Sequence, residues 1–301
     1  INFIMAIIGI YTVRYSDSET TYVYNASNQL VSDSETSYEY DLNGNLVRVI
    51  GSAHSALYEY NAENKLIKAT VQNGSLVTEE SYTYDYQGNR TSKTTHKSNG
   101  EFEYTKYLND NSNLTNVLCE LDENGTAKCV YTIGADLISQ ERDGRTSFYL
   151  YDGHGSVTAI VNESGVVTDT YCYDAFGNLI SSTGSTVNNY CYCGEQFDST
   201  TGLYYLRARY MDTSTGRFIT QDTYQGTIND PVSLHKYLYA NANPVTYSDP
   251  SGYMSAADLT LGQACLLMIG SGVISGTINV GLSILKDLTY KKELNNAAFI
   301  F

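Results

Sequence analysis

The stretch Tyr38-Glu-Tyr40-Asp41-Leu-Asn-Gly44-Asn45-Leu46 decides the fold of this chain. Two tyrosines that are two residues apart lie on the same face of a strand, and the glutamate between them lies on the other face. The aspartate starts a turn by hydrogen bonding to the nearby backbone, and the glycine accepts the positive φ that such a turn needs. Because Leu46 then begins a return strand, the stretch predicts a β-hairpin.

This element recurs along the chain with the same order of tyrosine pair, Asp or Asn, and Gly or Asn. The other copies begin at Tyr22, Tyr58, Tyr82, Tyr149 and Tyr171. From Tyr24 the spacings between second tyrosines are 16, 20 and 24 residues, which suits two short strands and two turns. One hairpin cannot bury its tyrosines alone, so we expect the copies to stack side by side into a continuous, coiled sheet.

We expect the tyrosine rings to pack on one face of this sheet, with hydroxyls reaching water or neighbouring carbonyls. A surface on which carbohydrate rings stack is the alternative. The composition agrees with a mainly β protein, since the 301 residues include 29 tyrosines, no tryptophan and three prolines. Charged residues make up 17% and the net charge is −15, which argues against nucleic-acid binding through the repeat region.

The cysteines and histidines predict neither a metal site nor a cofactor. The six cysteines form no C-x-x-C pair, and the four histidines lie in separate segments. Cys119 and Cys129 flank the turn around Gly125, so they are expected either to face each other across a hairpin as a disulfide or to remain unoxidised in the core.

A second long pattern lies downstream of the repeats. It reads Gly194-Glu-Gln-Phe197, Gly202-Leu-Tyr204-Tyr205-Leu-Arg207-Ala-Arg209-Tyr210, Gly216-Arg217-Phe218-Ile-Thr-Gln-Asp222, Tyr237-Leu-Tyr239-Ala-Asn241-Ala-Asn243-Pro244 and Asp249-Pro250-Ser-Gly252-Tyr253. Together with the tyrosine repeats, this pattern closely resembles the RHS/YD-repeat proteins, and residues 194–253 resemble the RHS repeat-associated core. That module ends the repeat array in bacterial polymorphic toxins and in the C subunits of insecticidal toxin complexes.

The resemblance and the change of composition at each end together predict four regions. Residues 1–19 would be an apolar leader or truncated repeat in what looks like an excerpt of a longer chain, 20–193 the YD-repeat strip, 194–253 the core, and 254–301 a short, apolar, helical tail. The resemblance also implies a secreted or cell-surface β-shell that encapsulates its own C-terminal toxin, with an immunity protein and a delivery apparatus as partners. A cell-surface adhesion or carbohydrate-binding scaffold that releases no toxin is the alternative function.

In many members of this family the core is an aspartyl autoprotease that cuts just after an Asp-Pro-x-Gly-Leu signature. Carboxylate-catalysed hydrolysis needs two aspartates near one water, one acting as base and one as acid. Here Asp222 and Asp249 match, Arg217 is expected to orient a carboxylate or polarise the scissile carbonyl, and Asp230 is a weaker candidate. The cut is expected between Tyr253 and Met254, where tyrosine replaces the usual leucine.

The alternative for both aspartates is that they simply start turns, as Asp and Asp-Pro often do.

For the tail, the 27 residues 259–285 carry no charge, and lysines 286, 291 and 292 follow them. This run suits either a helix in contact with a membrane or the start of a toxin domain that packs inside the shell.

Overall fold

The computed structural model describes residues 10–15, 18–52, 54–110, 112, 114–134 and 136–253. The chain divides into two units, Ile1–Ser255 and Ala256–Phe301, and every described residue belongs to the first. The predictions for residues 1–9, for Met254 and for the helical, apolar segment 259–285 therefore lie outside the described residues. In the described part of the chain, no helix is long and apolar enough to cross a bilayer.

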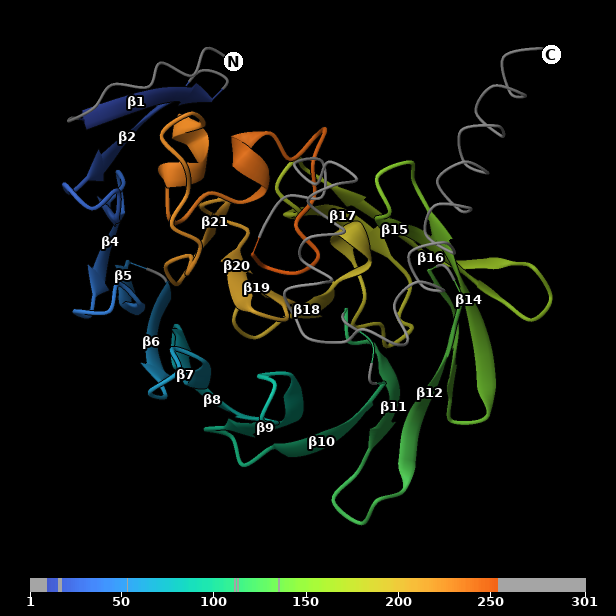
Figure 1. The fold of residues 1–301 in the computed structure, drawn as a ribbon. Coiled ribbons are helices and arrows are strands. Elements are labelled where there is room, and N and C mark those ends of the chain that lie inside the picture. Colours follow the sequence, from blue (N-terminus) through green and yellow to red (C-terminus); the bar gives the residue numbers. More distant parts are fainter. Residues whose placement is uncertain are drawn as a thin grey trace, which may run out of the picture. The chain divides into compact units, whose positions relative to one another are not determined.

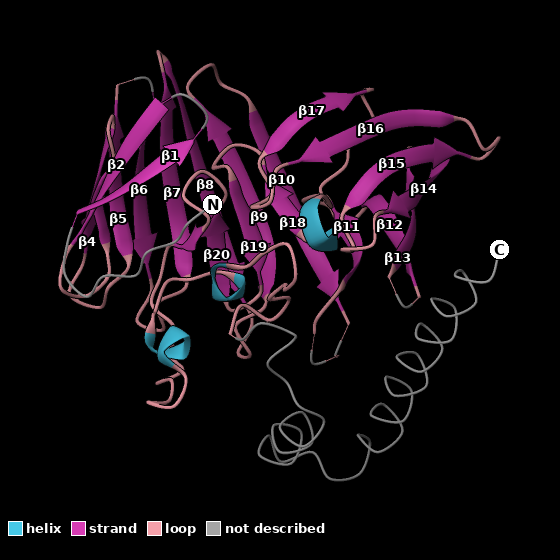
Figure 2. Cartoon of the chain, turned by 90° about the horizontal axis from the view of Figure 1, so that it is seen from above, coloured by secondary structure: helices cyan, strands magenta, loops and turns pink. Residues whose placement is uncertain are grey.

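Among the described residues, one sheet of seventeen strands forms the wall predicted from the repeats, and each strand pairs antiparallel with the next one along the chain. Figure 1 shows the strands following one another in an arc from blue to yellow-green, and Figure 2 shows them side by side. The strands are β1 (Ile10–Tyr15), β2 (Ser18–Tyr24), β3 (Leu30–Ser32), β4 (Thr36–Tyr40), β5 (Leu46–Gly51), β6 (His54–Tyr60), β7 (Leu66–Asn73), β8 (Leu76–Tyr84), β9 (Arg90–Lys97), β10 (Phe102–Asn109), β11 (Val117–Leu121), β12 (Ala127–Ile133), β13 (Leu137–Arg142), β14 (Arg145–Tyr151), β15 (Val157–Asn162), β16 (Val167–Tyr173) and β17 (Leu179–Thr183).

A smaller sheet, which we call the core sheet, lies on the inner side of this arc (Figure 1). Its strands are β18 (Gln196–Asp198), β19 (Leu203–Leu206), β20 (Arg209–Asp212) and β21 (Arg217–Phe218), accompanied by short 3₁₀ helices at Tyr192–Gly194, Pro231–Leu234 and Ala240–Ala242. The prediction of a mainly β fold built from a sheet of repeat hairpins is confirmed.

The repeat turns have the geometry that the sequence predicted. The amide of Asp41 donates to the carbonyl of Asn45, and its Oδ1 accepts from the amides of Asn43 and Asn45 at 2.9 and 2.8 Å. Gly44 has a φ of +78°, and asparagines fill the equivalent place in two other repeats, with φ of +60° at Asn28 and +58° at Asn64. Glycine and asparagine tolerate this region best, which explains the alternation in the sequence.

The tyrosine pairs bind one repeat to the previous one. In the repeats that begin at Tyr58 and Tyr82 the first tyrosine is buried, and the second donates its hydroxyl to a backbone carbonyl of the preceding repeat. Tyr60 donates to the carbonyl of Leu46 at 2.7 Å and Tyr84 to that of Leu66 at 2.5 Å. The hydroxyl is therefore satisfied while its ring is half-buried, so each ring stabilises the stacking of hairpins.

The inner face of the wall packs directly on the core sheet. Tyrosines and leucines of β4 to β8 share one apolar cluster with Leu203, Tyr210 and Ile219. Backbone and hydroxyl hydrogen bonds also cross, since the amide of Leu46 donates to the carbonyl of Ile219 at 2.8 Å and the hydroxyl of Tyr237 donates to that of Gly44 at 2.9 Å. The turn between β4 and β5 therefore contacts the core directly.

Of the two expectations for Cys119 and Cys129, the structure has the unoxidised one. Both thiols are free and buried. The register places Glu120, not Cys119, opposite Cys129, so the two thiols point to opposite faces of the sheet. Burial raises the pKa of Cys129 to about 11, which keeps this thiol protonated near neutral pH.

Candidate functional site

The structure brings Asp222 and Asp249 together around one guanidinium, that of Arg209. Nη2 of Arg209 lies 2.8 Å from Oδ2 of Asp222 and 3.5 Å from Oδ2 of Asp249. The side chain of Asp249 is 3% exposed and that of Arg209 is 5% exposed, so this is a buried charge cluster rather than a surface ion pair. We call these three residues the aspartate pair and its arginine.

The core sheet helps to hold this arginine in place. Arg209 begins β20, and its guanidinium stacks on the ring of Phe218 in the neighbouring strand, 3.6 Å from the ring centroid. Burial lowers the pKa of Arg209, and the charges of Asp222 and Asp249 oppose that shift. The backbone of Asp222 is fixed as well, because its amide donates to the carbonyl of Lys236 at 2.9 Å.

Each aspartate of the pair also starts a turn, with its other oxygen. Oδ1 of Asp222 accepts from the amide of Tyr224 at 2.8 Å, and Oδ1 of Asp249 accepts from the amide of Tyr253 at 3.2 Å. The two interpretations drawn from the sequence are therefore compatible in geometry, since Oδ1 shapes the turn while Oδ2 faces the arginine. Through its turn, Asp249 contacts the residue that precedes the expected cut.

The segment after Asp249 runs against the β19–β20 turn. Arg209 donates from Nε to the carbonyl of Gly252. Gly252 has a φ of +69°, and a Cβ at this position would lie 2.3 Å from the carbonyl oxygen of Leu206. A side chain cannot be accommodated there without moving backbone, which gives a physical reason for the glycine in the Asp-Pro-x-Gly signature. Tyr253 follows with 48% of its surface exposed.

Arg217, which the sequence suggested as the partner of the aspartates, lies elsewhere. Its Nη2 donates to the carbonyl of Asn28 at 2.5 Å, and its guanidinium stacks over the rings of Tyr24 and Tyr237 at 5.0 and 5.6 Å. Its described contacts thus join the core to the first repeats. Asp230 is exposed and precedes the 3₁₀ helix Pro231–Leu234.

Sequence reasoning did not select Arg209, although the residue stands inside the quoted pattern. The signal was the arginine pair Arg207-Ala-Arg209 directly between two apolar strands. A charged residue at the start of a buried strand needs a buried partner of opposite charge, and the aspartates are such partners.

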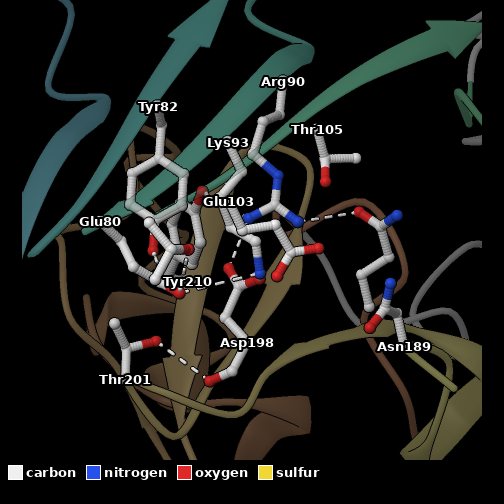
Figure 3. Close-up of polar contacts among 12 residues, drawn as sticks. Glu80, Tyr82, Arg90, Lys93, Glu103, Thr105, Asn189, Asp198, Thr201 and Tyr210 are labelled. Carbon is white, nitrogen blue, oxygen red and sulfur yellow. Dashed lines mark hydrogen bonds and ion pairs between the residues drawn. The ribbon is translucent and has the colours of Figure 1, made fainter. Parts of the chain in front are cut away.

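A second buried charge cluster joins the wall to the core sheet (Figure 3). Arg90 of β9 donates from Nη1 to Asp198 of β18 and from Nη2 to Gln196 at 2.9 Å, and Nζ of Lys93 lies 3.0 Å from Oδ1 of Asp198. Rings of Tyr82, Tyr107, Tyr205 and Tyr210 surround the Arg90 guanidinium. Both positive side chains come from the wall and point to one aspartate of the core.

Comparison with known proteins gives the family. Residues 9–245 match the Teneurin YD-shell family. The chain belongs to this family. The match covers both the repeat wall and most of the core, so the resemblance to RHS/YD-repeat proteins is confirmed.

Curated relatives of this YD-shell chain include bacterial nucleases and an animal protein. The tRNA3(Ser)-specific nuclease WapA of Bacillus spizizenii is 37% identical over 248 residues, 80% of this chain and 10% of that protein. The tRNA nuclease WapA of Bacillus subtilis is 36% identical over the same shares. Human Teneurin-4 is 26% identical over 64% of this chain and 7% of its own length. The chain thus spans about a tenth of the length of the WapA relatives.

Solved structures share the fold of this YD-shell chain at low sequence identity. The crystal structure of TcdB2-TccC3-Cdc42 has a TM-score of 0.53 at 19% identity and covers 78% of this chain and 15% of its own. The Tc holotoxin pore of Photorhabdus luminescens has a TM-score of 0.52 at 17% identity, with shares of 79% and 15%. The chain is an RHS-type shell scaffold related to toxin proteins.

Proposed function

We propose that this chain encapsulates its own C-terminal segment as a toxin and releases it by cutting the bond between Tyr253 and Met254. The observation that carries the proposal is the convergence of Asp222 and Asp249 on Arg209, with Asp249 holding the amide of Tyr253 at 3.2 Å. Two carboxylates and a guanidinium are therefore gathered beside the segment that leads into the expected cut.

The chemistry of this step is peptide hydrolysis. One carboxylate of the pair acts as base and takes a proton from a water molecule, and the hydroxide adds to the carbonyl carbon of Tyr253. The other carboxyl group acts as acid and gives its proton to the Met254 nitrogen as the bond to that nitrogen breaks. The two groups thereby exchange protonation states, so no other reactant is needed. Arg209 holds the carbonyl of Gly252 and keeps the peptide beside the pair.

The cargo would be the segment that follows residue 253. The WapA relatives are named as tRNA nucleases, which supports a toxin role for RHS-type chains of this kind. Partners would be this C-terminal segment, an immunity protein and a delivery apparatus, in a secreted or cell-surface protein. A membrane contact through residues 259–285 is the alternative for the tail, and leakage of liposomes by a synthetic 254–301 peptide would favour it.

The test is N-terminal sequencing of the products when the chain is expressed with additional repeats upstream. Wild type should yield a fragment that begins at Met254, and Asp249→Asn should stay whole. Asp41→Asn is the matched control, because Asp41 starts a repeat turn in the same way but belongs to the wall, and it should leave cleavage unchanged. A wild-type chain that folds and remains uncut overturns the protease proposal.

The adhesion scaffold is the second candidate, and the similarity to human Teneurin-4 is the observation in its favour. It predicts binding of the intact repeat region to a glycan array, with no release of a C-terminal fragment. Cleavage of the wild-type chain without glycan binding would rule out the adhesion function.

A further inference from the structure

The β19–β20 turn, residues 207–209, contacts three consecutive carbonyls of the segment that leads to the expected cut. Arg207 donates from Nη1 to the carbonyl of Pro250 at 2.6 Å, and the amide of Ala208 donates to that of Ser251 at 3.3 Å. Arg209 donates from Nε to the carbonyl of Gly252. Successive residues of the turn therefore bind successive residues of the segment. We call residues 207–209 the template for this segment.

The turn is not stable in this shape by its own sequence. Arg207 has a φ of +57°, a backbone region that glycine and asparagine adopt far more readily than arginine. A non-glycine residue keeps such a conformation only when its surroundings fix it. The contacts that fix Arg207 are therefore part of what shapes the template.

Those contacts come from two separate places in the wall. Lys65, in the hairpin between β6 and β7, donates from Nζ to the carbonyls of Arg207 and Ala208 at 3.3 and 3.2 Å. The carbonyl of Thr115, in the loop before β11, accepts from Nε of Arg207 at 3.0 Å. Within the core, both carboxylate oxygens of Glu195 accept from Nη1 of the same arginine at 2.9 Å.

We propose that Lys65 and Arg207 are positioning residues for the proposed cleavage, and that the core cleaves the chain only when it is in contact with the wall. This inference rests on the proposed self-cleavage. The wall contacts fix the conformation of the turn, and the turn fixes the positions of the carbonyl groups of residues 250–252. These positions place the bond after Tyr253 beside the aspartate pair. Cleavage then follows closure of the wall around the core, so the cargo is cut free only after the shell has formed.

The experiment follows cleavage of the full chain during cell-free synthesis. Lys65→Met keeps the apolar stem but removes both hydrogen bonds to the turn, and it should slow cleavage by about tenfold or more, because a small misplacement of reacting groups has an effect of this order. Lys65→Arg restores a donor and should recover most of the rate. The matched control is Lys68→Met on β7, whose partly exposed side chain pairs with Glu79 at 2.8 Å, and it should cleave like wild type.

The fold of Lys65→Met is measured in an Asp249→Asn background, where cleavage cannot alter the melting curve. Arg207→Lys is the second variant, since it keeps the charge but loses the fork that joins Thr115, Glu195 and Pro250, and it should be slowed as well. If wild type cleaves and both variants cleave at its rate, this inference is wrong while the proposed function stands. If folded wild type does not cleave, the proposed function fails and this inference fails with it.

Discussion

Positive-φ glycines determine the repeat turns at the scale of single residues. A Cβ at Gly44 would come within 2.1 Å of Nε2 of Gln221 in the core, whereas a Cβ at Gly100, also at positive φ, would meet no atom of the described residues within 4 Å. The two glycines share the backbone requirement and differ in what surrounds them. Comparing the two glycines therefore separates the conformational role of a turn glycine from its role in letting the core approach the turn closely.

Gly44→Ala and Gly100→Ala test this difference. Gly100→Ala should lower the free energy of unfolding by about 1 kcal/mol, the cost of a left-handed backbone with a side chain. Gly44→Ala should cost about 1 kcal/mol more, because Gln221 must also move. Urea unfolding of both variants measures the difference, and equal losses would show that the close approach at Gly44 has no energetic weight.

His235 is the residue that should make the fold sensitive to mild acid. Burial, together with the charge of Arg217, lowers its pKa to about 4, and its Nδ1 accepts a hydrogen bond from the amide of Tyr237 at 3.2 Å. The unfolded state binds a proton below about pH 6.5, whereas the folded state binds it only near pH 4. The contribution of His235 to stability is therefore present above pH 6.5 and is lost as the pH falls toward 4.

His235→Gln should remove this dependence while keeping an acceptor near the Tyr237 amide. Between pH 7 and pH 4 wild type should lose up to about 3 kcal/mol more stability than the variant. Melting curves across this pH range provide the measurement. Parallel losses in wild type and variant would mean that other groups dominate acid unfolding.

Arg90 connects two elements, the wall and the core sheet, at a place where the repeat pattern changes. The residue that pairs with the second tyrosine of a repeat is Leu30, Leu46 or Leu66 in three repeats, and it is Arg90 in the next. The leucines are buried in an apolar cluster, and the arginine is equally buried but paired with Asp198. One substitution in the repeat thus converts an apolar contact into an ionic link to the core sheet.

Arg90→Met should lower the free energy of unfolding by about 3–5 kcal/mol, because it leaves Asp198 buried beside a single remaining cation. Arg48→Met is the control, since the Arg48–Glu39 pair is separated by 3.9 Å with both side chains about half exposed. This variant should lower the free energy of unfolding by no more than about 0.5 kcal/mol. Equal effects of the two variants in urea unfolding would contradict a special role for the buried link.

The sequence predicted the wall elements well because their causes are local. A tyrosine pair, an Asp or Asn and a Gly or Asn within nine residues specify a hairpin, and the turns at Asp41 and Asn61 have the predicted hydrogen bonds. The site was predicted only in part. Asp222 and Asp249 meet, but Arg209 and not Arg217 lies between them, because the partners of a buried arginine are set by strand packing across distant residues and not by local spacing.

At the scale of the whole molecule, the described chain is a wall and a core that depend on each other. The core contributes the aspartate pair and its arginine, of which Arg209 lies in the core sheet and both aspartates follow it, and the wall contributes the contacts that hold the core in place. In the proposed function, Asp222 and Asp249 act as one unit in cutting the chain after Tyr253, rather than only starting turns.

The most direct test is intact-mass measurement of the purified wild-type chain and of the variants Asp222→Asn and Asp249→Asn. Asparagine still accepts the turn hydrogen bonds through its side-chain oxygen, so the turns are kept while the carboxylates are lost. We predict two masses for wild type, one for the fragment that ends at Tyr253 and one for the fragment that begins at Met254, and a single uncut mass for each folded variant. A folded wild type with one uncut mass, or an Asp222→Asn variant that is cut as completely as wild type, would contradict the proposed function.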